Sequence, residues 1–301
     1  MPVKWHARKA RLCQPKMPPK LRLLLLGTAG TGKIHTANIA ITEVRTILGS
    51  YDSVLTMAFT GVASVNLGTG ARTIDSIFHT NRNDASEDLT GENLDTLVEE
   101  LRGVELVVID EISTCSASTL EVVSRRMQQV SRVLWRERFG SPPPDDLGPF
   151  GGLGVLLMGD FAQLPPVLST SLMPGMPLVG GSGSAATSLA LAGRQTFNSF
   201  EDVIRFRRIH RQKGVDAFKD STMRLRDVAN TVEDYDLWKT HELDSLDPDG
   251  ECSWPGSGRL LDEALVLVPE NSPAGKLNGQ RLAKRAALVG EPGTASSERK
   301  P

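Results

Sequence analysis

Short apolar runs recur along the first half of the chain, and each is followed by glycine or polar residues. The runs cover residues 21–26, 54–59, 106–109 and 155–158. Their length suits β-strands, and their nearly continuous hydrophobicity is typical of parallel strands that are buried on both faces. We therefore expect a sheet whose strands end at polar or glycine-rich turns.

Between these runs, apolar residues are spaced as on one face of a helix. The three stripes are Ala37, Ala40, Ile41, Val44, Ile47 and Leu48; Leu94, Leu97, Val98 and Leu101; and Leu120, Val123, Met127, Val130 and Leu134. Strand, turn and helix in repetition predict an α/β fold with a parallel sheet and helices on both faces. In such folds ligands bind at the carboxyl ends of the strands, where the glycine-rich and acidic signatures of this chain fall.

Composition agrees with a folded domain. The chain has 301 residues, 40% of them apolar and 23% charged, with a net charge of -2. This excludes collagen and a wholly disordered chain. The longest aliphatic run, residues 23–26, is far too short for a membrane span, so we expect no membrane association. The cysteines Cys13, Cys115 and Cys252 are far apart, which argues against a disulfide framework and favours a reducing compartment.

Charge is distributed unevenly despite the small net value. Residues 1–42 hold eight Lys or Arg residues and no acid. The segment is interpreted as a solvated tail, a nucleic-acid-binding arm or a targeting segment. No apolar stretch of the kind found in signal peptides follows it, which argues against secretion.

A phosphate-binding loop follows the first predicted strand. Residues 27–33 read G-T-A-G-T-G-K and match G-x-x-x-x-G-K between a strand and a helix. Backbone N–H groups of such a loop surround nucleotide phosphates, and Lys33 reaches the β- and γ-phosphates. The predicted ATP-binding residues are Gly27, Thr28, Ala29, Gly30, Thr31, Gly32, Lys33 and Ile34.

Ile34 departs from this motif, because the residue after the lysine is normally Ser or Thr, whose hydroxyl ligates Mg²⁺. Thr36 cannot replace it, since two residues along a helix correspond to a rotation of about 200°. We expect Mg²⁺ to take a water molecule at this place and to bind more weakly.

Two acids end the third strand. Asp110 is predicted to hold Mg²⁺ through its water shell, and Glu111 to orient or deprotonate the attacking water. An Asp-Glu pair in an ordinary loop is the alternative interpretation. After the fourth strand, Gln163 is placed to contact the γ-phosphate through its side-chain amide.

The ordered set of motifs resembles the Pif family of DNA helicases, in superfamily one. The resemblance covers residues 21–226. It lies in residues 27–33, in 60–66 (TGVASVN) with 73–76 (TIDS), in 109–113 (IDEIS) with 116–117, in 149–152 (PFGG) with 159–166 (GDFAQLPP), and in 209–212 (IHRQ). It implies a RecA-like P-loop NTPase fold with Lys33, Asp110, Glu111, Gln163 and Arg211 at the ATP site.

The same resemblance implies contacts with single-stranded DNA at Thr60, Asn66, Thr73 and Ser76. These residue types are also common in loops and helix caps, so a purely structural role is the alternative. Asp75 stands where the family usually has histidine, and an acid there would repel phosphate. The resemblance further implies an ATP-dependent helicase that moves 5′-to-3′ on single-stranded or forked DNA in repair, recombination or telomere maintenance. A monomer in the nucleus, or alternatively the mitochondrion, is expected.

The domain organisation follows from these motifs. We predict six segments in chain order. They are a basic irregular lead (1–20), a RecA-like ATP-binding domain (21–170), a Gly/Ser-rich loop or linker (171–195), a motif IV segment (196–226), a partial second RecA-like domain (227–288) and a disordered tail (289–301). The second domain begins with a predicted strand at 264–268, and only 32 residues follow Pro269. The family's last motifs, including a second arginine, are absent from the sequence.

Three functions are therefore open at the level of sequence. The chain is a helicase motor whose hydrolysis is weakened by Ile34 and the short second domain. Alternatively it is a nucleic-acid-binding or interaction module that keeps the fold with little turnover, or a different P-loop NTPase. The segments 150–152 and 163–166 argue against the last of these.

Overall fold

The computed structural model describes residues 20–68, 70–80, 87–179, 184–210 and 216–240, with residues 275, 276, 278, 279 and 282 in addition. The chain divides into two compact units between Gly214 and Val215, and each is considered by itself. The sequence predictions for most of the basic lead, for the strand at 264–268 and for the tail at 289–301 lie outside the described residues.

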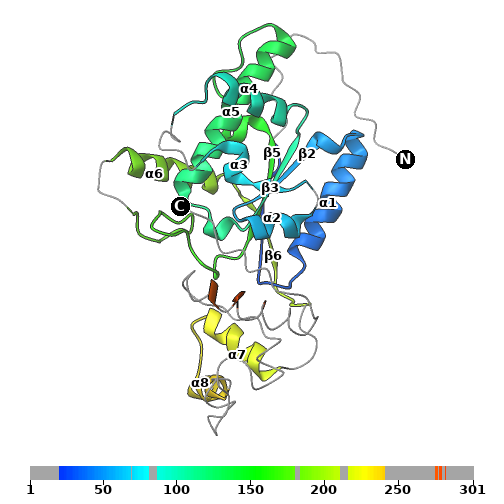
Figure 1. Cartoon of the computed structure of the whole chain (residues 1–301). Helices are drawn as coiled ribbons and strands as arrows, with labels where there is room; N and C mark the ends of the chain where they lie inside the picture. Colours follow the sequence, from blue (N-terminus) through cyan, green and yellow to red (C-terminus); the bar gives the residue numbers. More distant parts are fainter. Residues whose placement is uncertain are drawn as a thin grey trace. The chain divides into compact units, whose positions relative to one another are not determined.

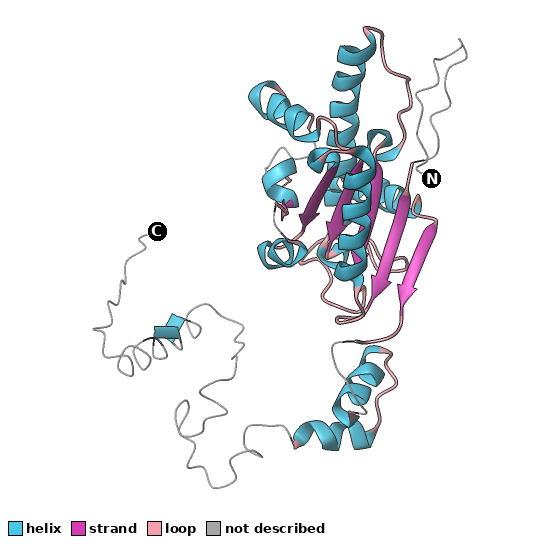
Figure 2. Ribbon diagram, turned by 90° about the vertical axis from the view of Figure 1, so that its right-hand side faces the viewer, coloured by secondary structure: helices cyan, strands magenta, loops and turns pink. Residues whose placement is uncertain are grey.

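The first unit is built on a six-stranded sheet in the order β3-β2-β4-β5-β1-β6 (Figures 1 and 2). Every pairing is parallel. The strands are β1 (Arg22–Gly27), β2 (Val54–Ala58), β3 (Arg72–Thr73), β4 (Leu106–Asp110), β5 (Gly154–Gly159) and β6 (Asp202–Phe206). The predicted parallel α/β sheet is confirmed.

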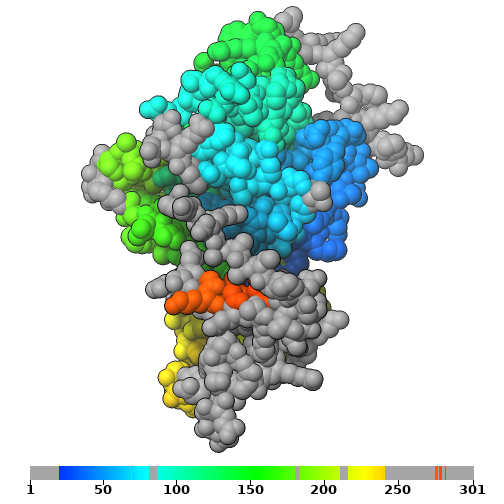
Figure 3. Space-filling model, viewed as in Figure 1, coloured from blue at the N-terminus to red at the C-terminus, as the bar shows by residue number. Residues whose placement is uncertain are grey.

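Helices cover both faces of this sheet, and successive strand residues alternate between two cores. Val107 and Ile109 of β4 pack into one core, and Val108 packs into the other. The core that contains Val108 includes residues from α1 (Lys33–Leu48) and α2 (Gly61–Leu67). The opposite core is lined by α3 (Ile74–Phe78), α4 (Gly91–Leu101), α5 (Ala117–Phe139) and α6 (Ala185–Asn198). On the face shown in the space-filling view, α1 and the blue-to-cyan segment that contains α2 and α3 lie at the surface (Figure 3).

Two elements of this unit differ from the sequence expectation. The predicted loop over 171–195 is wrong in its last part, because α6 begins at Ala185, with the Ser184 side chain accepting a hydrogen bond from the Thr187 N–H group (3.1 Å). Ala190 and Phe197 of this helix are buried in the core. β6 pairs with β1, so the strand part of the 196–226 segment belongs to the first sheet. The hydrophobic pattern did not predict α6 because the helix is rich in small residues, and it did not predict β6 because the strand is largely exposed.

Gly193 allows α6 to cross the start of α5 closely. A Cβ atom at this glycine would lie 1.8 Å from the Ala117 carbonyl oxygen. Gly193→Ala is therefore expected to lower the free energy of unfolding by about 3 kcal/mol, although alanine favours helix. Urea unfolding measures this loss. Gln195→Ala, on the exposed side of the same helix, is the matched control and is expected to stay within about 0.5 kcal/mol of wild type.

One cysteine of the chain lies among the described residues. Cys115 is buried, and burial raises the pKa of its thiol to about 12, so the thiolate is disfavoured at neutral pH. Cys13 and Cys252 are outside the described part. Among the helices that the structure describes, none combines the length and hydrophobicity needed to cross a bilayer.

The described part of the second unit contains α7 (Ala217–Arg226) and α8 (Val232–Lys239). Arg224 joins them through a two-point ion pair with Asp234, in which Arg224 Nε lies 2.8 Å from Asp234 Oδ2. This guanidinium lowers the pKa of Asp234 to about 2. The Trp238 indole N–H group donates to Ser221 Oγ (2.8 Å), which further ties the two helices together.

Candidate nucleotide-binding site

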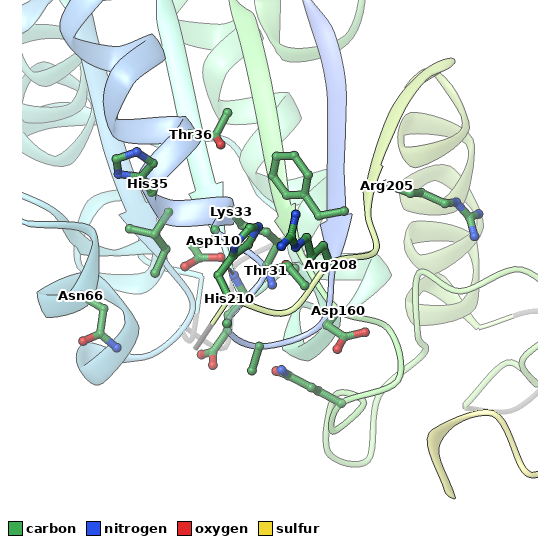
Figure 4. Close-up of a pocket in the computed structure, with 18 of the residues that line it drawn as sticks. Thr31, Lys33, His35, Thr36, Asn66, Asp110, Asp160, Arg205, Arg208 and His210 are labelled. Carbon is green, nitrogen blue, oxygen red and sulfur yellow. Dashed lines mark hydrogen bonds between the residues drawn. The ribbon is translucent and has the colours of Figure 1, made fainter. Parts of the chain in front are cut away.

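A cavity of about 970 Å³ opens where β1, β4 and β5 end, in the first unit (Figure 4). This is the edge where the sequence predicts ligand binding. The predicted residues that line it are Ala29, Gly30, Thr31, Gly32, Lys33, Ile34, Asn66, Asp110, Glu111 and Gln163. Segments far apart in the sequence therefore meet at one site.

The phosphate-binding loop is held by its own hydrogen bonds. Thr31 is buried, and its hydroxyl donates to the Thr28 carbonyl (2.8 Å). Gly32 caps α1 with φ 94°, a left-handed conformation that suits glycine. At Gly27 a Cβ atom would lie 2.7 Å from Thr31 Oγ1 and 2.9 Å from Phe206 Cβ, so the glycine lets the loop and the end of β6 approach.

Lys33 is the first residue of α1, and its side chain folds over the loop. Its ammonium donates to the carbonyl oxygens of Gly27 (2.5 Å) and Thr28 (3.2 Å). Nucleotide phosphates are stronger partners for an ammonium than neutral carbonyls. The lysine is thus held at the loop to which phosphates would bind.

Asp110 ends β4 and is almost fully buried. Burial raises the pKa of its carboxyl, and the Glu111 N–H group (2.8 Å to Oδ1) and the Lys33 charge act in the opposite direction. A buried carboxylate of this kind is stabilised by a further cation. This donor fits a divalent metal, and Asp110 is the residue that would hold it.

Glu111 has a left-handed backbone, with φ 60° and ψ 39°. This conformation costs a non-glycine residue about 1–2 kcal/mol and is commonly retained where it serves a site. The Glu111 carboxylate lines the cavity and accepts a hydrogen bond from the Thr60 hydroxyl (2.9 Å to Oε2). The unusual backbone therefore coincides with the predicted water-activating base.

The turn after β5 brings Gln163 to the cavity. The backbone N–H group of Gln163 donates to the Asp160 carbonyl (2.9 Å). The Asp160 side chain accepts through Oδ1 from the backbone N–H group of Ala162 (3.2 Å). Asp160 is buried and also lines the cavity, a role that the sequence analysis missed. The available signal was that Asp160, like Asp110, closely follows an apolar run of the sequence.

The segment that follows β6 closes another side of the cavity. The His210 N–H group donates to the Gly30 carbonyl (2.8 Å), and Phe206, Arg208 and His210 line the cavity. In Figure 4, Arg208 and His210 lie beside Lys33, and Arg205 extends away from it. The sequence predicted Arg211 as the cationic residue of the 209–212 motif, and Arg211 lies outside the described part. The cavity-lining positions of Arg208 and His210 were not predicted.

Most of the residues predicted to contact DNA have structural partners. Thr60 caps α2 and accepts from the Ala63 N–H group, and Thr73 caps α3 and accepts from the Ser76 N–H group. Ser76 donates back to the Thr73 carbonyl (2.8 Å). Asn66 lies on α2 and lines the cavity. The cap role anticipated as the alternative is thus present at Thr60 and Thr73, and their DNA contact stays a prediction.

The sequence profile of PIF1-like helicases matches residues 19–236. The chain belongs to the PIF1-like helicase family. The ATP-dependent DNA helicase Pif1 of Bdellovibrio bacteriovorus is 32% identical over 190 residues, which are 60% of this chain and 38% of that protein. A solved structure of two coordinating Pif1 helicases at forked double-stranded DNA matches with a TM-score of 0.59 and 21% identity, over 88% of this chain and 54% of the matched chain.

The ATP-dependent DNA helicase PIF1 of Saccharomyces cerevisiae is 27% identical over 270 residues, which are 87% of this chain and 26% of that protein. The chain thus spans roughly a quarter to a half of these relatives. The solved structures, at their level of identity, establish the RecA-like fold, and the profile match establishes the family.

Ile34 sets this member of the family apart from the phosphate-binding motif at the position of the metal ligand. It lines the cavity directly after Lys33, and its side chain has no oxygen. Thr36 is exposed, and in Figure 4 it lies well apart from Asp110. Within the described residues, no group of three or more His, Cys, Asp or Glu side chains is arranged to hold a metal. Asp110 stays the predicted donor for Mg²⁺.

Proposed function

We propose that this chain carries the ATP-hydrolysing part of a Pif1-type DNA helicase, in which hydrolysis drives movement along single-stranded DNA. The carrying observation is the convergence of Lys33, Asp110 and Glu111 on one cavity at the strand ends. A lysine for phosphate, a buried carboxylate for metal and a second carboxylate for water form the set that phosphoryl transfer to water requires. Family membership supports the same chemistry.

Each residue has a defined part in this proposal. The loop N–H groups and Lys33 bind and neutralise the phosphates, and Glu111 orients the attacking water and accepts its proton. Gln163 contacts the γ-phosphate through its amide, and Arg211 adds positive charge there. Asp110 would hold Mg²⁺, which would supply further charge neutralisation on the phosphates.

Single-stranded or forked DNA is the proposed partner. Support comes from structures of relatives, among them Bacteroides Pif1 bound to single-stranded DNA. Movement in the 5′-to-3′ direction, a role in repair, recombination or telomere maintenance, and a nuclear or mitochondrial location belong to the same proposal. They rest on the resemblance to the family.

The direct test is steady-state ATP hydrolysis by the purified chain with Mg²⁺, with and without oligo(dT). We expect slow turnover that single-stranded DNA raises about tenfold or more, and no turnover in Lys33→Ala, which lacks the phosphate-binding ammonium. Turnover that Lys33→Ala retains would contradict the assignment of this site. Turnover that is unaffected by DNA would point to a different P-loop NTPase.

Ile34 supports a second candidate, a nucleic-acid-binding module with little or no turnover. In that case the chain binds oligo(dT) equally well with and without nucleotide. Its affinity then falls steeply with salt, as expected for contacts with backbone phosphates. Fluorescence anisotropy of labelled oligo(dT) across a salt series separates this function from the motor.

A further inference from the structure

The Thr60 hydroxyl links the start of α2 to the predicted base. It accepts a hydrogen bond from the Ala63 N–H group (3.2 Å) and donates to Glu111 Oε2 (2.9 Å). A threonine hydroxyl has a single proton. Because the amide donates to the oxygen, that proton is directed to Glu111, so the helix cap fixes the direction of the second bond.

The register of the sheet creates this contact. Ala58 of β2 lies opposite Asp110 of β4 in a parallel pair. Thr60 and Glu111 follow these residues directly, at the same edge, although they are 51 positions apart in the sequence. The contact therefore depends on the pairing of the neighbouring strands β2 and β4.

Few other groups constrain the Glu111 carboxylate. Its own N–H group is bonded to Asp110, and no other protein donor to this carboxylate is found among the described residues. Thr60 holds Oε2 and leaves Oε1 for another partner. An attacking water requires a carboxylate oxygen with a defined position, since general base catalysis depends on hydrogen-bond geometry.

We propose that Thr60 is a positioning residue that orients the Glu111 carboxylate for water activation, in place of the DNA contact expected from its motif. The proposal rests on the proposed hydrolytic function. Loss of the hydroxyl would then slow the chemical step without weakening the binding of ATP or of DNA.

Three substitutions at Thr60 separate its two hydrogen bonds. Thr60→Ser keeps both bonds, Thr60→Val removes both at nearly constant volume, and Thr60→Asp keeps the cap but places a like charge against Glu111. We expect kcat to fall about tenfold or more in the Val and Asp variants and to stay within about twofold in Ser. The KM for ATP and the oligo(dT) affinity are expected to remain within about twofold in all three.

Matched controls address folding and the base itself. Ser184→Ala removes the N-cap of α6 and is expected to leave kcat unchanged. In a Glu111→Gln background, Thr60→Val is expected to cause no further loss, because both changes act on one group. Equal losses in the Ser and Val variants would overturn the proposal, as would full activity in the Asp variant. A loss confined to oligo(dT) affinity would also overturn it and would make Thr60 a DNA contact.

A thermal-unfolding cycle tests the pair without turnover. Thr60→Val and Glu111→Ala are expected to be non-additive in Tm, because each removes one side of the same hydrogen bond. Additive changes would overturn the proposal. A wild-type chain that neither binds nor hydrolyses ATP would refute the proposed function, and this cycle would still decide whether the pair exists.

Discussion

Glu111→Gln is expected to lower ATP turnover about a thousandfold while leaving nucleotide affinity within about twofold of wild type. The amide keeps the size of the side chain and can still accept the Thr60 hydrogen bond, but it cannot accept a proton from water. The phosphate contacts of the loop and Lys33 are not altered by this change. Single-turnover hydrolysis and fluorescent-nucleotide binding measure the two effects separately.

A matched glutamate is available as a control. Glu105 precedes β4 at the opposite edge of the sheet and pairs with Lys20 (3.0 Å). Glu105→Gln repeats the chemical change away from the cavity and is expected to leave turnover unchanged. Retention of a tenth or more of the activity in Glu111→Gln would assign the base elsewhere, and loss of nucleotide binding would give Glu111 a structural role instead.

The backbone of Glu111 adds a second readout to the same position. Since φ is 60° there, Glu111→Gly relieves conformational strain and is expected to raise stability by up to about 1 kcal/mol. It should also abolish hydrolysis. A variant that is inactive and at least as stable as wild type excludes misfolding as the cause of inactivity.

The central strands and their chemistry could be predicted because they depend on local pattern. β4 is buried at every position, so its apolar run stands out before Asp110. The loop that ends in Lys33 has a fixed spacing of glycines between strand and helix. By contrast, β6 is an edge strand in which Val203 is 44% and Ile204 47% exposed, so its residues lack the hydrophobic continuity of a central strand.

Contacts that depend on sheet register could not be predicted from the sequence. The Thr60–Glu111 hydrogen bond needs β2 and β4 to be neighbours in one specific alignment. The bond from His210 to the Gly30 carbonyl similarly needs β6 to lie beside β1. The resemblance of residues 60–66 to the family placed Thr60 near DNA. The sequence contained no signal that its side chain would bond to Glu111, which follows a different strand.

Ile34→Ser is expected to increase Mg²⁺-dependent turnover about tenfold at limiting Mg²⁺ and to lower the Mg²⁺ concentration needed for half-maximal rate. The substitution places a hydroxyl directly after Lys33, in the first turn of α1 and beside the cavity that contains Asp110. A protein oxygen at this place would replace one water ligand of Mg²⁺. It would offset part of the free-energy cost of dehydrating the metal, so Mg²⁺ would bind more tightly. Nucleotide affinity measured without metal should not change.

Ile34→Ala separates the new oxygen from the loss of a bulky side chain. Alanine removes the branched chain without adding a ligand, and we expect it to match wild type in its Mg²⁺ requirement. A titration of turnover against Mg²⁺ for the three proteins makes the comparison. An equal gain in the Ser and Ala variants would mean that Ile34 acts by obstructing the cavity. No gain in either would mean that Asp110 and water already satisfy the metal, so Ile34 would not limit turnover.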